Sequence, residues 1–352
     1  MWGSSELILK FIIKTIKQTR TMAVTINDIK KLRDMTGAGL SDCKKALIES
    51  DNDIEKAKEL IRKRGQAIAA KREDRDAAQG IAIGKSVGNF AAIVALKCET
   101  DFVAKNEKFV TLAKNLLDAA IENRVKTLDE LTALTIDGKS VPDAITALSG
   151  ITGEKMELGA YECLEAPSTV VYNHFNGMLS AAVAFNQENV DGDVAKAIAM
   201  QVASMNPMKA TRDQIAKEVI DEELRVAIDK TKAEQVKKAV EAALKKAGFN
   251  PYYCATEEHQ DEAVRKGYMT QEQVDQAKKL MAETAAAKEA NMPEQMIQNI
   301  AQGRLNKFYQ ENVLMEQVYE AGENKETVAQ FLEAASKGLA AVDLKRVNLN
   351  VD

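Results

Sequence analysis

The first clear pattern in the chain is a set of three short segments in which apolar residues recur every three or four positions. Residues at this spacing lie on one face of a helix. The apolar positions are Ile26, Ile29 and Leu32 in the first segment, Leu40, Cys43, Ala46 and Leu47 in the second, and Ile54, Ala57, Leu60 and Ile61 in the third. Asp53 is a favourable N-cap for the third helix. The pattern predicts a small three-helix domain over residues 26–70, and the basic run at 63–72 is interpreted as a solvated helix end that becomes a linker.

A pair of strand-like segments followed by a helical segment occurs twice farther along the chain. The segments are strands 80–86 and 90–98 with helix 105–120, and then strands 170–175 and 178–185 with helix 193–204. Two more strands are predicted at 154–164 and 340–351. The repeated order predicts two related halves packed as one core, so the expected fold class is α+β.

A long, highly charged stretch over residues 212–302 has helical character but few apolar positions. Val226, Val236, Val240 and Leu244 form only a weak apolar stripe. A turn is expected at residues 248–251, and residues 271–290 are helical again. This pattern predicts an antiparallel helical hairpin, such as a short coiled coil.

These patterns divide the chain into parts. The parts are an extension over 1–21, a three-helix domain with its linker over 22–76, the first half of the core over 77–166, and the second half over 167–352 with the helical hairpin inserted at about 225–295. The apolar run at 7–13 is too short for a membrane span, and its positive charges follow it, unlike those of a signal peptide. We therefore expect the extension to be disordered or to result from an upstream start.

Composition excludes several classes of function. The formal net charge is -5, which argues against a nucleic-acid-binding protein. The four cysteines and two histidines are dispersed, so a zinc site is not expected and the thiols suit a reducing cytosol. Residues 80–86 nearly match a phosphate-binding loop, but three residues rather than four separate the glycines and no helix follows. We expect no bound nucleotide, no cofactor and no hydrolytic centre.

The most informative short segment is Thr100-Asp101-Phe102-Val103-Ala104, which joins a predicted strand to a predicted helix. Such junctions usually lie on the surface, where a phenylalanine needs a reason. One interpretation is that Asp101 caps the helix and Phe102 packs into the core as a hydrophobic staple. The other is that Phe102 is a wedge offered to a partner. The segment alone does not decide between them.

A second segment favours the wedge interpretation. Residues 32–47, Leu-Arg-Asp-Met-Thr-Gly-Ala-Gly-Leu-Ser-Asp-Cys-Lys-Lys-Ala-Leu, together with the segment at 100–104, closely resemble the elongation factor Ts family. Members of that bacterial family expel GDP from elongation factor Tu. The resemblance runs from about Met22 almost to the C-terminus and implies that the three-helix domain is similar to a ubiquitin-associated domain. The helical hairpin is longer than the family pattern leads one to expect.

The resemblance also implies roles for individual residues. Asp101 and Phe102, flanked by Thr100 and Val103, match the pair that intrudes near the magnesium site of elongation factor Tu. The other matching positions that face the partner are Arg33 and Leu40 in the N-terminal domain and His174 in the second half. This chain departs from the family at Ser41, often a second apolar residue, and at Gly177, where the family has an arginine.

The resulting hypothesis is a cytoplasmic guanine-nucleotide exchange factor whose partner is elongation factor Tu. It needs no covalent chemistry, so we expect no enzyme in the sense of a reaction class. The alternative is a helical adaptor or scaffold protein without exchange activity, and a nucleotide-binding enzyme is the third choice.

Overall fold

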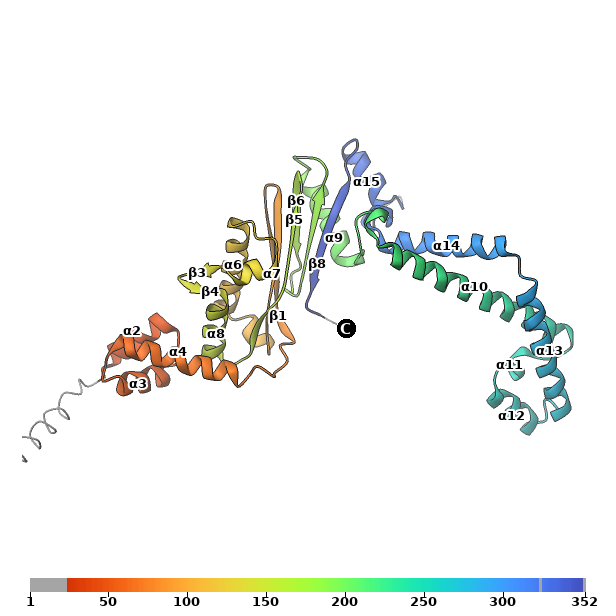
Figure 1. The fold of residues 1–352 in the computed structure, drawn as a ribbon, viewed down its shortest axis with the longest axis horizontal. Helices are drawn as coiled ribbons and strands as arrows, with labels where there is room; N and C mark the ends of the chain where they lie inside the picture. The colour runs from red at the N-terminus through yellow and green to blue at the C-terminus, as the bar shows by residue number, and fades with distance from the viewer. Residues whose placement is uncertain (1–23, 323–324, 351–352) are drawn as a thin grey trace, which may run out of the picture. The chain divides into compact units, whose positions relative to one another are not determined.

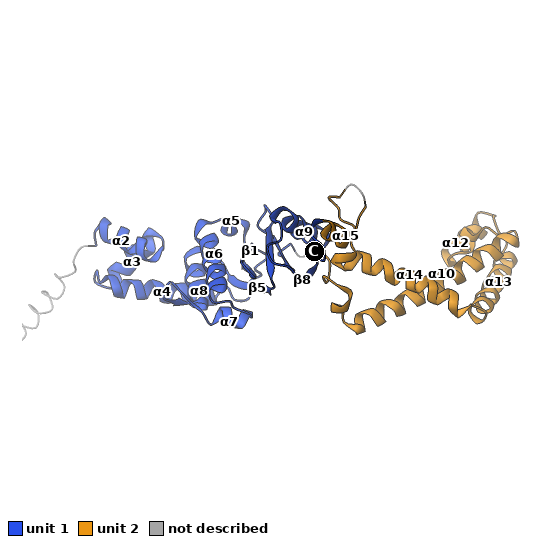
Figure 2. Ribbon diagram, turned by 90° about the horizontal axis from the view of Figure 1, so that it is seen from above, with its two compact units in different colours: residues 1–206, 335–352 blue, residues 207–334 orange. Residues whose placement is uncertain are grey.

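The computed structural model describes residues 24–322 and 325–350, and its internal contacts divide the chain into two units. Unit 1 contains residues 1–206 and 335–352, and unit 2 contains residues 207–334 (Figure 2). The predicted extension at 1–21 lies outside the described residues. The other predicted domain boundaries stay predictions, and the two units are described separately below.

Unit 1 begins with the three predicted helices, which the structure confirms. They are α2 (Ile26–Thr36), α3 (Leu40–Glu49) and α4 (Ile54–Ala70). Asp53 caps α4 as expected, because its side chain accepts a hydrogen bond from the Lys56 backbone N–H. Buried side chains from all three helices and from the α2–α3 turn form the core: Leu32, Ala38, Cys43, Ala46, Leu47 and Ala57. The likeness to a ubiquitin-associated domain stays a prediction.

The basic run at 63–72 is helical as far as Ala70, as expected of a helix end. Helix α4 continues to Ala70 because it packs against α8 (Val141–Thr152). The two helices meet at glycines, and a Cβ atom on Gly150 would lie only 2.3 Å from the Cα atom of Gly65. Arg64 also pairs with Glu49 on α3. The basic run therefore contacts α8 and α3, which could not be predicted from the run itself.

Two three-stranded antiparallel sheets follow in unit 1 (Figure 1). The first has the order β1 (Gln79–Val87), β2 (Phe90–Cys98), β5 (Met156–Glu165), and the second has the order β6 (Ser168–Asn173), β7 (Leu179–Phe185), β8 (Ala341–Asn348). Small side chains such as Ala82, Ala95 and Ala182 fill the space between them. The two predicted hairpins and the α+β class are confirmed. However, β6 ends at Asn173 rather than Phe175, because the chain turns there.

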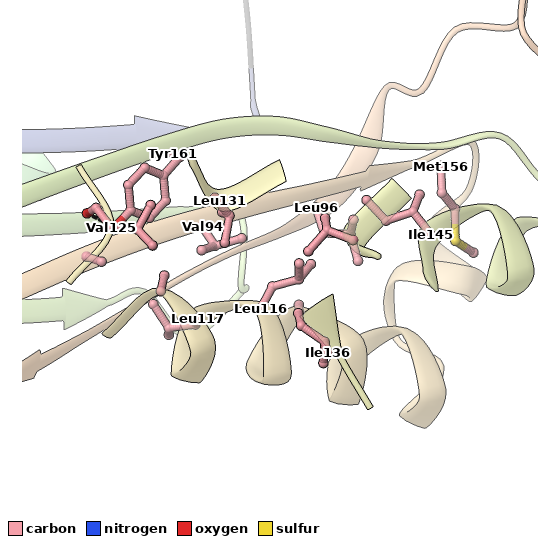
Figure 3. Close-up of a cluster of buried hydrophobic side chains, with 14 of the residues drawn as sticks. Val94, Leu96, Leu116, Leu117, Val125, Leu131, Ile136, Ile145, Met156 and Tyr161 are labelled. Atoms are coloured by element: carbon pink, nitrogen blue, oxygen red, sulfur yellow. Dashed lines mark hydrogen bonds between the residues drawn. The ribbon is translucent and has the colours of Figure 1, made fainter. Parts of the chain in front are cut away.

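Helices cover the outer face of the first sheet. They are α5 (Asp101–Ala104), α6 (Glu107–Glu122), α7 (Leu128–Thr132) and α8, with the short β3 (Thr135–Ile136) and β4 (Lys139–Ser140) between α7 and α8. Their apolar side chains and those of β2 and β5 form the largest core cluster (Figure 3). In it, the buried Tyr161 hydroxyl donates to the Val125 carbonyl over 2.7 Å. Helix α9 (Gly192–Met205) packs on β6 and β7, as the repeated pattern predicts.

Unit 2 is helical. Its elements are α10 (Lys217–Lys246), α11 (Pro251–Cys254), α12 (Glu257–Arg265), α13 (Gln271–Ala290), α14 (Glu294–Asn312) and α15 (Val328–Ala335), with 3-10 turns at Arg212–Gln214 and Leu314–Glu316. Helix α10 packs against both α13 and α14. The predicted helix over 271–290 is confirmed. The simple two-helix hairpin is wrong in detail, because its return leg breaks near Pro293 and two short helices close its tip.

Candidate functional site

The junction between β2 and α6, residues 98–104, is held by side chains from distant parts of unit 1. Thr100 donates its hydroxyl to Glu154 Oε1 over 2.7 Å and its backbone N–H to Glu154 Oε2 over 3.0 Å. The same hydroxyl oxygen accepts a hydrogen bond from the Val103 N–H, so Thr100 is the N-cap of α5. The interpretation that Asp101 is the cap is therefore wrong. Glu154 fixes the Thr100 side chain in a position where its hydroxyl oxygen can accept from the Val103 N–H.

Phe102 points away from the core. Its side chain is 83% exposed, whereas the next residue, Val103, is half-buried and packs against the main core cluster. The staple interpretation is therefore wrong. The helix predicted over 105–120 is confirmed as α6, which begins at Glu107 because Asn106 caps it, and residues 101–104 form the separate turn α5. Val103 fixes the inner side of that turn, and Phe102 occupies its outer side.

Asp101 lies beside Phe102 on the exposed side of α5. The Lys105 ammonium donates to its Oδ2 atom over 2.7 Å. This hydrogen bond and the positive charge of Lys105 lower the pKa of Asp101 below its ordinary value. The carboxylate is therefore ionised at neutral pH and is held by a solvent-exposed partner that another cation could replace.

The residues just before the cap are also fixed. Glu99 accepts hydrogen bonds from the Lys155 backbone N–H, over 2.6 Å, and from Arg72, and the Lys155 bond is the main reason why the pKa of Glu99 lies below its ordinary value. Cys98 donates its thiol to the Thr100 carbonyl over 3.2 Å, and burial raises the pKa of Cys98 to about 12. The junction thus presents Phe102 on a supported backbone.

Arg33 and Leu40 lie on either side of the turn between α2 and α3. Both are exposed, and 49% of Leu40 is accessible. The turn itself contacts the start of α6, where Lys108 Nζ donates to the Gly37 carbonyl over 3.3 Å. Met35, which is 46% exposed beside the same turn, was not singled out from the sequence. The structure therefore connects this predicted contact region to the helix that follows Phe102.

His174 directly follows β6 and is half-buried. Its Nδ1 atom lies 3.0 Å from the Tyr172 hydroxyl, and its backbone N–H donates to Leu179 across the turn. The adjacent Phe175 is 92% exposed, and its ring centroid lies 4.5 Å from that of His174. Sequence reasoning missed Phe175 because it placed this residue in a strand. The Asn-Gly pair that follows it predicted the turn, but the strand ends two residues earlier than that signal indicates.

Within residues 24–322 and 325–350, no group of three or more His, Cys, Asp or Glu side chains could hold a metal ion. Residues 80–86 lie in strand β1. Over the same described ranges, no helix is both long and apolar enough to cross a membrane. What the junction offers is an exposed ring and an adjacent carboxylate.

Comparisons with known proteins agree with this description. The family model described as Elongation factor TS matches residues 99–247 and 231–350. Elongation factor Ts from Bacteroides thetaiotaomicron is 52% identical over 332 residues, which cover 94% of this chain and 100% of that protein. The proteins of the same name from Parabacteroides distasonis and Porphyromonas gingivalis are 51% and 42% identical over the same shares of both chains.

Proposed function

Since this chain belongs to the elongation factor Ts family and is thus a translation elongation factor, we propose that it is the guanine-nucleotide exchange factor for elongation factor Tu. In this proposal it binds the GDP form of that partner, disturbs the magnesium and phosphate site, and promotes GDP release so that GTP can bind. The place of action is the bacterial cytoplasm. No substrate bond is made or broken, so the protein is not an enzyme in the usual sense.

The observation that supports this proposal most directly is the exposure of Phe102 on a fixed backbone. A ring that is 83% exposed on a capped and hydrogen-bonded turn contributes little to the fold of its own chain. Burial of a phenylalanine side chain in a partner is worth about 1.5–3 kcal/mol. The rigid support means that little of this energy is lost to ordering the segment on binding.

Exchange follows if Phe102 fits only one state of the partner. The burial energy is then available only when the magnesium and phosphate contacts of elongation factor Tu have been disturbed. Binding of the factor lowers the affinity for GDP, and GDP lowers the affinity for the factor by the same ratio. Incoming GTP restores the contacts and displaces the factor. The Asp101 carboxylate places a negative charge beside the ring, where it opposes phosphate binding.

The other predicted residues serve to hold the partner in this scheme. Arg33 and Leu40 contact it from the N-terminal helices, and His174 contacts it from the β6–β7 turn. Leu40 supplies apolar area and Arg33 supplies charge, while Ser41 gives less apolar contact than the residue often found there in the family. These contacts position Phe102 but do not themselves disturb the nucleotide site.

Stopped-flow release of fluorescent GDP from elongation factor Tu tests the proposal. We expect the chain to accelerate release in a concentration-dependent and saturable way, and to bind no GDP by itself. Binding of the partner without any acceleration at saturation would contradict exchange and support the helical adaptor. Tight binding of GDP to the isolated chain would instead indicate a nucleotide-binding enzyme.

A further inference from the structure

Among the described residues of unit 1, two phenylalanines are almost fully exposed, and only one of them has a role so far. Phe102 is 83% exposed and Phe175 is 92% exposed, whereas Phe90, Phe109 and Phe185 are at most 1% exposed. An exposed ring is costly in water unless a partner covers it. Phe175 therefore needs its own explanation.

The turn that carries Phe175 is well ordered by its hydrogen bonds. The His174 N–H donates to the Leu179 carbonyl over 2.8 Å, and the Gly177 N–H donates to the His174 carbonyl over 2.9 Å. Asn176 adds a side-chain bond to the Met178 N–H. Gly177 has a φ of 71°, which a side chain would strain. The ring rests on His174 and has little freedom to lose when a partner covers it.

The turn lies beside the same end of β1 as the junction that carries Phe102. The Ala82 N–H donates to the Gly177 carbonyl over 2.7 Å, and Gly177 faces the side chain of Ile81. On the other side, α5 also contacts β1, and Ile81 and Val103 pack against the same core cluster. Gln79, at the start of β1, pairs with Cys98, where the junction begins. Three residues of a strand span only about 10 Å.

We propose that Phe175 is a second aromatic anchor for the partner that receives Phe102, and that it controls affinity rather than the rate of nucleotide release. This inference rests on the proposed function. The occupant is an apolar patch on the surface of elongation factor Tu, because the turn is continuous with the surface that carries Phe102 and His174. A partner that covers one ring is within reach of the other.

The two rings have different effects because they occupy different positions. If Phe102 enters the nucleotide site, the ring on the far side of Ile81 contacts the partner outside that site. Its contacts are then the same before and after GDP leaves. Interactions that are equal in both states strengthen binding but do not change the limiting rate. Phe175 therefore lowers the concentration of factor needed for half-maximal release.

The test compares Phe175→Ala, Phe102→Ala and a control, Val87→Ala, by titrating each factor against elongation factor Tu loaded with fluorescent GDP. Val87 is 50% exposed and lies at the opposite end of β1. We expect Phe175→Ala to raise the half-saturating concentration by about ten-fold or more, with the saturating rate unchanged. Phe175→Leu should recover part of this loss. Val87→Ala should change neither quantity.

Several results would overturn the inference. If Phe175→Ala keeps the half-saturating concentration of the wild type, the ring does not contact the partner. If it instead lowers the saturating rate, the ring acts on release and not on affinity. If the wild type alone forms dimers in sedimentation velocity and Phe175→Ala does not, the occupant is a second copy. Thermal melts by circular dichroism must show that each variant folds.

Failure of the inference is separate from failure of the proposed function. If the wild type accelerates GDP release and Phe102→Ala does not, the proposed function stands whatever Phe175→Ala does. If the wild type itself gives no acceleration, the proposed function fails and the inference fails with it.

Discussion

Helix α6 in unit 1 and helix α10 in unit 2 are stabilised in different ways. Helix α6 has 16 residues, and five of them are buried on one face against the first sheet. Helix α10 has 30 residues, and only Ala227, Thr231 and Leu244 are buried. Apolar burial is the main source of stability, so the longer helix has far less of it per residue.

Two of the clusters of buried side chains in unit 2 lie in different parts of it. One includes Leu305 and Tyr309 of α14 with Ile215 and Val313, and the other lies between α10 and α13 where α11 and α12 close the tip. The buried residues of the tip cluster are Leu244, Cys254, Ala263, Met269, Val274 and Ala277. Unit 1 instead has a large continuous core beneath the junction. The comparison leads us to expect that the core of unit 1 fixes the junction that carries Phe102, whereas a change in the tip cluster of unit 2 leaves that junction in place.

The largest expected effect comes from breaking the core of unit 1. Phe109 is fully buried in α6, so Phe109→Ala should lower the free energy of unfolding by about 3–5 kcal/mol. Urea unfolding followed by circular dichroism measures this loss. Leu244→Ala, in the tip cluster, is the matched change in unit 2 and should leave the transition of unit 1 in place. If Leu244→Ala shifts that transition equally, the two units unfold together and the comparison is wrong.

The next effect separates fold from function within unit 1. Phe102→Ala should slow GDP release at saturating factor by about ten- to a hundred-fold, since burial of the ring is worth roughly 1.5–3 kcal/mol. Its melting temperature should equal that of the wild type, because the ring lies outside the core. Asp101→Ala should cause a smaller loss in the same direction. If Phe102→Ala melts at a lower temperature than the wild type but exchanges at the normal rate, the ring belongs to the core and does not contact the partner.

A smaller effect concerns the support of the junction and its dependence on pH. The lowered pKa of Glu99 means that its stabilising contribution is present above its unfolded-state pKa, close to 4.5, and is lost as the pH falls through the lower folded value. Glu99→Gln should lower stability at pH 7 by about 1 kcal/mol. The gap between the variant and the wild type should close on acidification. A gap that is constant from pH 7 to pH 3 would exclude this account.

The smallest effect on unit 1 should come from the largest deletion. Removing residues 232–291 and joining the ends with a short Gly/Ser loop should change the stability of unit 1 by less than about 0.5 kcal/mol, because the deleted residues lie in unit 2. The deletion retains the cluster around Leu305 and Tyr309. GDP release should persist. An insoluble or unfolded product would show that the helical hairpin belongs to the core.

Periodicity predicted helices such as α6 because they bury one face. It did not predict that Thr100 caps α5, because the Thr100 side chain is held by a hydrogen bond to Glu154, which is 54 residues away. It did not predict that α4 packs against α8, because this contact joins residues that are far apart in the sequence. The exposure of Phe175 was missed for a related reason, since an apolar residue at the end of an alternating run looks the same whether the strand continues or turns.

The crossing of α4 and α8 has an asymmetric consequence for how the sequence can change. A Cβ atom on Gly150 would lie 2.3 Å from the Gly65 Cα atom, but a Cβ atom on Gly65 would lie an ordinary 3.5 Å from the Gly150 Cα atom. Every missense codon change at either glycine adds at least this carbon. A deep mutational scan should therefore find position 150 closed to all substitutions, while position 65 accepts alanine. Two touching glycines would then differ completely in their genetic tolerance.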